Sequence, residues 1–105
     1  MLDKAFFVSP DVQEKIVSLP NGEKHTLYFK ELTGIKFRKF FLSSQSENEE
    51  IKDYAIANLI SLGLCNSDGT PALTAEQASQ LSASGLNAIF MALLDVNGQG
   101  DQKKD

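Results

Sequence analysis

The sequence has one cysteine, one histidine and no tryptophan among its 105 residues. A single thiol, Cys65, allows no internal disulfide, which predicts a protein of the reducing cytosol. Zinc needs several Cys or His ligands, and one of each is too few. A Ser-His-acid triad would have to use His25, and the chain contains no Gly-x-Ser-x-Gly turn. We expect His25 to pack on its strand and Cys65 to be a buried structural thiol.

Long apolar runs are also missing. No stretch approaches the roughly 20 residues that cross a bilayer. The apolar run at residues 5–8 stops before Pro10, which makes it too short for a secretory signal. We therefore expect no membrane partner.

Positive charge is in the minority, with ten basic against fourteen acidic residues and a net charge of −4. Proteins that bind nucleic acids normally carry a basic stripe that neutralises phosphates. The nearest cluster is Lys36, Arg38 and Lys39, interleaved with apolar residues on an expected helix. We interpret it as the solvated side of that helix and expect no nucleic-acid partner.

Two glycine-containing segments match ligand-binding loops only in part. A calcium loop aligned on Gly69 would have Leu64 at its first ligand position and Ala75 at its last, where carboxylates are required. After Gly98, Lys103 stands where a dinucleotide-binding loop has its third glycine. The sequence therefore predicts no catalytic residue, no metal site and no cofactor, and we expect a protein that is not an enzyme.

Hydrophobic residues make up 42% of the chain, and a chain of this length can bury enough surface for one core. The pattern predicts an α+β fold, with an N-terminal β-hairpin or small antiparallel sheet followed by about four α-helices. A single domain is expected over residues 1–98. Residues 99–105 contain no apolar side chain and are predicted to form a disordered tail.

The N-terminal third has the pattern of a hairpin. Residues 12–19 and 25–30 are predicted strands, separated by the turn signal Pro20-Asn21-Gly22. Strand alternation puts His25, Leu27 and Phe29 on one face. Residues 1–11 are open between two interpretations, an edge strand or a packed flap that includes Phe6 and Phe7.

After the hairpin, the apolar residues recur at the spacing of an α-helix. Phe37, Phe40 and Phe41 share a face of a helix that starts near Gly34 and ends in the serine-rich residues 43–46. Ser46 and Glu49 fit a capping box for the next helix. That helix is apolar on two sides, so we expect it to be central in the fold or covered by a partner. One side has Ile51, Ala55, Leu59 and Leu62, and the other has Ile56, Ile60 and Leu64.

Two further helices are expected after the loop at residues 66–71. Thr74 and Gln77 form a capping box for a short helix that reaches about residue 82. A last helix is predicted over residues 86–96, ending at Asn97-Gly98.

Seven phenylalanines are a rich supply for so short a chain. Exposed aromatic patches normally mark contact sites. Each of these apolar faces could equally be buried in the core of the chain itself. The candidate partner-binding residues are Phe6, Phe7, Phe37, Phe40, Phe41, Leu86, Ile89, Phe90 and Leu93.

Together these elements resemble a known family. The hairpin leads into Glu31-Leu32-Thr33-Gly34, and the apolar helix leads into Leu62-Gly63-Leu64-Cys65-Asn66-Ser67-Asp68-Gly69-Thr70-Pro71-Ala72-Leu73-Thr74. Gln77-Ala78, Leu81 and a closing Val96-Asn97-Gly98 follow. Over residues 16–98 this is similar to the tail assembly chaperones of long-tailed bacteriophages, a family without a catalytic motif.

The resemblance implies a role in virion assembly. Such a chaperone would bind the tape measure protein, keep that long helical chain soluble and help to recruit tail tube subunits. It would act in the host cytoplasm, be absent from the mature virion, form homo-oligomers and associate with a frameshift-extended form of itself. The alternative is another small protein-binding adaptor or regulatory protein of phage or prophage origin.

Overall fold

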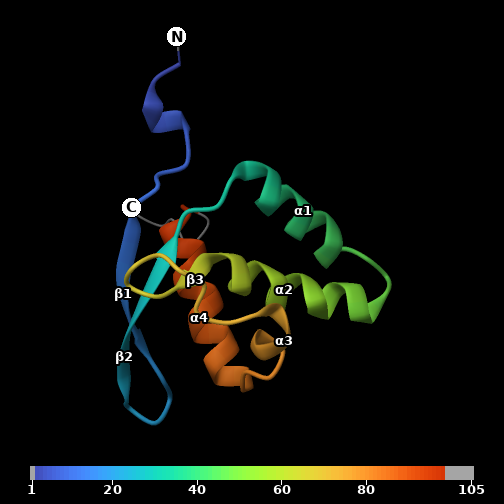
Figure 1. The fold of residues 1–105 in the computed structure, drawn as a ribbon. Coiled ribbons are helices and arrows are strands. Elements are labelled where there is room, and N and C mark those ends of the chain that lie inside the picture. Colours follow the sequence, from blue (N-terminus) through green and yellow to red (C-terminus); the bar gives the residue numbers. More distant parts are fainter. Residues whose placement is uncertain (1, 99–105) are drawn as a thin grey trace, which may run out of the picture.

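The computed structural model describes residues 2–98 and has the α+β fold that the sequence predicts (Figure 1). The predicted tail, residues 99–105, lies outside the described residues. In chain order the elements are the 3₁₀ helix η1 (Lys4–Phe6), β1 (Val12–Ser18), β2 (Lys24–Lys30), α1 (Gly34–Ser44), α2 (Glu49–Gly63), β3 (Leu64–Cys65), α3 (Ala75–Ala78) and α4 (Ala83–Val96).

The sheet is antiparallel with the strand order β1-β2-β3. The predicted hairpin is confirmed, and Gly22 in its turn has a φ of 92°, a conformation that favours glycine. The predicted alternation places Phe29, which is completely buried, at the centre of the core face. The expectation that His25 packs is wrong, because His25 lies at the exposed turn end of the hairpin, 3.1 Å from a carboxylate oxygen of Glu23.

Strand β3 was not predicted, and a tight loop creates it. Asn66 and Thr70 close this loop, since the Asn66 N–H donates to the Thr70 carbonyl over 2.8 Å. The Asp68 carboxylate accepts bonds from the Thr70 N–H and hydroxyl, and these bonds hold the pKa of Asp68 below its usual value. Cys65 is buried, as expected, and burial raises the pKa of its thiol.

Helix α2 is central, as the sequence predicts: it contacts α1, α3, α4 and β3. Its predicted N-cap is wrong. Asn48, rather than Ser46, caps the helix, because the Asn48 side-chain oxygen accepts from the N–H groups of Glu50 and Ile51. The Ser46 hydroxyl instead accepts from the Asn48 N–H, which holds the capping residue in place.

The C-terminal part follows the predicted order with shifted boundaries. The capping box of Thr74 and Gln77 is present, but α3 ends at Ala78, and Ser82 caps α4. At the other end of α4, the Asn97 side chain accepts a 2.7 Å bond from the Leu32 N–H. This bond ties the exit of the hairpin to the end of the last helix.

The N-terminal residues 2–8 form an arm that extends away from the sheet and helices (Figure 1). The expected edge strand is absent from these described residues, which contain the single turn η1 instead. Asp3 caps this turn by accepting from the Ala5 N–H over 2.8 Å. None of the residues of η1 is buried, so the alternative of a packed flap is also wrong.

Gly63 of α2 packs tightly against Leu93 of α4. A Cβ atom at this position would lie 2.3 Å from Leu93 Cδ1, and Leu93 is completely buried and has little room to move. We expect Gly63→Ala to lower the free energy of unfolding by about 1–3 kcal/mol, measured by denaturant titration. The matched control is Gly34→Ala, where a Cβ meets nothing within 4 Å. The control should be neutral or slightly stabilising, and equal effects at both positions would contradict this account.

Candidate binding groove

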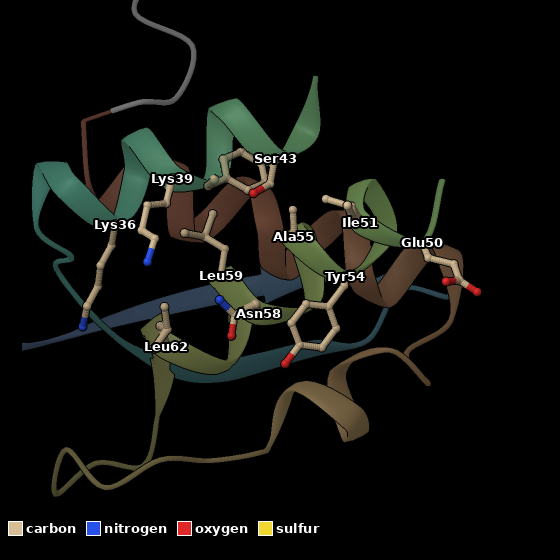
Figure 2. A pocket seen from close by; sticks show the side chains of 11 residues that line it. Lys36, Lys39, Ser43, Glu50, Ile51, Tyr54, Ala55, Asn58, Leu59 and Leu62 are labelled. Atoms are coloured by element: carbon tan, nitrogen blue, oxygen red, sulfur yellow. The ribbon is translucent and has the colours of Figure 1, made fainter. Parts of the chain in front are cut away.

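A groove of about 630 Å³ lies between α1 and α2 (Figure 2). Its lining is mostly apolar. Helix α1 contributes Lys36, Lys39, Phe40 and Ser43, and α2 contributes Glu50, Ile51, Tyr54, Ala55, Asn58, Leu59 and Leu62.

The groove arises from the two-sided pattern of α2. The side with Ile60 is packed in the core, with Ile60 completely buried. The opposite side faces α1, and all four of its apolar residues named from the sequence line the groove. Ala55 and Leu59 are buried, whereas Ile51 and Tyr54 are 47% and 57% exposed. The chain therefore covers the floor of this face and leaves its rim open to solvent.

Charged side chains lie at opposite ends of the groove. Figure 2 shows Lys36 and Lys39 toward the end marked by Leu62, and Glu50 at the far end beyond Ile51. Among the described residues, none of these three charged groups forms a salt bridge. The groove thus combines an apolar floor with unpaired charges of opposite sign at its two ends.

Two of the surfaces predicted to contact a partner, one on α1 and one on α4, pack against each other. Phe40 of α1 packs on Phe90 of α4 with ring centroids 5.6 Å apart, so the aromatic face of α1 meets the apolar face of α4. Phe37, Phe40 and Leu93 are buried members of the core. Their role as partner contacts stays a prediction, and of the three only Phe40 contributes to the groove wall.

The remaining predicted contact residues are accessible to different degrees. Leu86, Ile89 and Phe90 are half-buried and pack against the core. Phe41 is partly exposed, and its ring lies 5.2 Å from that of Phe40. Phe6 and Phe7 are strongly exposed on the N-terminal arm, and neither lines the groove.

Sequence analysis did not name the groove residues Ile51, Tyr54 and Leu62 as contacts. The available signal was the second apolar side of α2, which the sequence did display. Lys36 and Lys39 of α1 line the same groove because α1 and α2 pack side by side as an antiparallel pair. Helix periodicity alone does not predict which faces of two helices meet.

Polar chemistry elsewhere is sparse. Between residues 2 and 98 no group of three or more His, Cys, Asp or Glu side chains is arranged to hold a metal ion. Within the same range, no helix has both the length and the apolar character required to cross a membrane. The charged groups that act on Cys65 are Lys30 and Asp68.

Comparison of the chain with protein-family models, curated proteins and solved structures found no match.

The division between core and surface phenylalanines is testable at two neighbouring positions. Phe40 is 8% exposed and contacts Phe90, whereas Phe41 is 44% exposed. We expect Phe40→Ala to lower the free energy of unfolding by about 3–5 kcal/mol. Phe41→Ala should cost less than about half as much, because less area is lost. Chemical denaturation of both variants gives the comparison, and a larger loss at Phe41 would contradict the assignment.

Proposed function

We propose that this chain is a non-enzymatic binding protein that takes an amphipathic helix of another protein into the α1–α2 groove. The open rim of an otherwise buried apolar face carries this proposal. An exposed apolar face is unfavourable in water and is stabilised when another apolar surface covers it.

The shape of the groove favours a helix as the occupant. It is bounded by two antiparallel helices, so a third helix lying along it would complete a three-helix arrangement. Helix-in-groove recognition uses apolar anchors spaced at i, i+3, i+4 and i+7. Tyr54, an exposed aromatic at the rim, is of a residue type that often dominates binding energy.

The charges favour one orientation of that helix. Acidic side chains at one end of the bound helix would pair with Lys36 and Lys39, and basic side chains at its other end would pair with Glu50. Acidic residues are preferred in the first turn of a helix and basic residues in the last. The bound helix would therefore begin at the lysine end and run parallel to α1.

The resemblance to tail assembly chaperones names the partner class. A tape measure protein is a long helical chain whose apolar faces need cover before the tail is built. On this proposal the chain is a phage tail assembly chaperone that coats the tape measure protein in the host cytoplasm, helps to recruit tail tube protein and is absent from the mature virion. Homo-oligomers and association with a frameshift-extended form belong to the same proposal, and neither nucleic acid nor membrane is a partner.

The second candidate is an adaptor or regulatory protein of phage or prophage origin that uses the same groove. Both candidates predict binding of a helix, and only the chaperone predicts that binding raises the solubility of tape measure segments.

Groove binding is tested with Ile51→Glu. The probe is a fluorescein-labelled amphipathic peptide with leucines at i, i+3, i+4 and i+7, glutamates in its first turn and lysines in its last. Ile51 is at the third position of α2, where glutamate suits the helix N-terminus, so the variant should stay folded. We expect at least a roughly tenfold loss of affinity by fluorescence anisotropy, because a charge replaces an apolar rim contact.

The matched control is Ile35→Glu. Ile35 is more exposed than Ile51 and lies on α1, but it does not line the groove. This variant should bind the peptide as the parent does. Equal loss in both variants, or no binding by the parent chain, would contradict the proposed groove.

The chaperone role is tested by co-expression with segments of the tape measure protein from the genome that encodes this chain. We expect the parent chain to raise the soluble fraction of such a segment and Ile51→Glu to abolish the gain. Peptide binding without any gain in solubility would favour the adaptor instead.

A further inference from the structure

Strand β1 forms one edge of the sheet in the described part of the chain (Figure 1). Native proteins usually shield such an edge with a proline, a bulge or a very short strand. Strand β1 has no proline, is seven residues long and pairs with β2 in an unbroken register. Its outer edge therefore has the regular geometry that a further strand requires.

The hydrogen bonds of the hairpin show which residues of β1 turn their backbone outward. The Leu19 N–H donates to the Glu23 carbonyl over 2.9 Å, and the pairing of β1 with β2 continues from there without a break. Hydrogen-bonded and non-bonded pairs alternate along an antiparallel ladder, so residues 13, 15 and 17 bond to β2. The residues between them point their N–H and C=O groups away from β2. These residues are Val12, Glu14, Ile16 and Ser18.

Helix α4 provides a surface beside this edge. A hollow of about 340 Å³ is lined by residues of β1 and α4 and by none of β2, which places it on the outer side of β1. Met91 of α4 lines the hollow and is 46% exposed, and its flexible thioether adapts to side chains of different shape. Ala88 and Ala92 lie next to it on the same face of the helix. An added strand would thus rest every second side chain on a mostly apolar shelf.

We propose that the β1 edge binds an extended segment of another protein as an additional antiparallel strand. The main-chain groups of the segment pair with the outward groups of β1, and its apolar side chains face Met91. On the other face of the sheet, a β-branched residue lies opposite Ile16, which is 68% exposed, and a basic residue lies opposite Glu14.

Charge favours another protein over a second copy of this chain. Glu14 is exposed and forms no salt bridge within residues 2–98. In an antiparallel pairing of two β1 strands, the residue opposite Glu14 would itself have to turn its backbone outward. None of the four residues that do so is basic. A segment with a lysine or arginine at this position supplies the cation that a second β1 lacks.

This site is separate from the α1–α2 groove. The hollow beside β1 and the groove share no lining residue, and the groove takes a helix whereas the edge takes a strand. The inference therefore adds a second binding surface and does not rest on the proposed function.

The test uses the peptide Ser-Thr-Leu-Val-Leu-Lys-Thr with fluorescein at its N-terminus. In the intended register its valine lies opposite Ile16 and its lysine opposite Glu14. Amide hydrogen exchange is measured by NMR on the full chain, with and without saturating peptide. The outward amides of Glu14, Ile16 and Ser18 should exchange rapidly in the free chain and become protected in the complex. The amides between them already bond to β2 and should change little, so the protection should alternate along β1.

Contact through side chains alone would not produce this alternation. No binding by the parent chain, or outward amides that still exchange rapidly in the complex, would overturn the proposal. Protection of the outward amides in the free chain would show that a second copy or another part of the chain already covers the edge, and would overturn it as well.

Two methylated peptides test the main-chain pairing directly. A methyl group on the backbone nitrogen of the valine removes a donor that faces β1, and we expect affinity to fall roughly tenfold or more by fluorescence anisotropy. The matched control carries the methyl group on the first leucine, whose N–H faces away from β1, and should bind nearly as well as the parent peptide. Equal losses for both peptides would contradict strand addition.

A charge swap tests the expected cross-strand pair. Glu14 is exposed, so Glu14→Lys should leave the fold intact. We expect this variant to bind the peptide roughly threefold more weakly, and a peptide with glutamate in place of its lysine should restore the affinity. Weakening without this rescue would contradict the assigned register. Ile51→Glu, which damages the groove, should bind the strand peptide as the parent does. Loss of helical-peptide binding with strand-peptide binding intact would therefore remove the proposed function alone, and the reverse would remove only this inference.

Discussion

Helix α2 has apolar side chains on two opposite sides, and the described chain buries one of them more completely than the other. The side with Ile60 must be filled by the sheet and the other helices for a core to exist at all. Once α2 is placed in this way, its second side has to face outward. Helix α1 folds back over that side and covers Ala55 and Leu59, but it leaves Ile51 and Tyr54 at an open rim. The groove is therefore a consequence of how the core is built.

The aromatic residues show how the chain uses its apolar surface. Phe37 and Phe40 hold α1 against the body, in part through the contact of Phe40 with Phe90 of α4. Because α1 is anchored along this aromatic edge, the side of α1 with Lys36 and Lys39 overhangs the groove. Phe6 and Phe7 take no part in this packing. Among the described residues, the strongly exposed phenylalanines are thus the two on the arm, and Phe41 of α1 is partly exposed.

Local patterns predicted the elements well, because each depends on neighbouring residues. The hairpin followed from strand alternation around Asn21-Gly22, and the capping box from Thr74 and Gln77. The cap of α2 was misplaced because Ser46 and Asn48 are both good capping residues, and only the geometry shows that one supports the other. Strand β3 was not predicted because a strand of two residues is too short to show an alternating apolar pattern. The burial of Phe37, Phe40 and Leu93 could not be predicted in the same way, because periodicity identifies an apolar face without showing whether another face of the same chain covers it.

The most direct measurement of the central claim is a methyl NMR titration with the amphipathic helical peptide. If the open side of α2 is the binding face, the methyl signals of Ile51, Ala55 and Leu62 should shift together as peptide is added. Those of Ala57 and Ile60, which are buried on other sides of the same helix, should change little. Shifts clustered elsewhere on the molecule, or no shifts at peptide concentrations that saturate the anisotropy signal, would contradict the account.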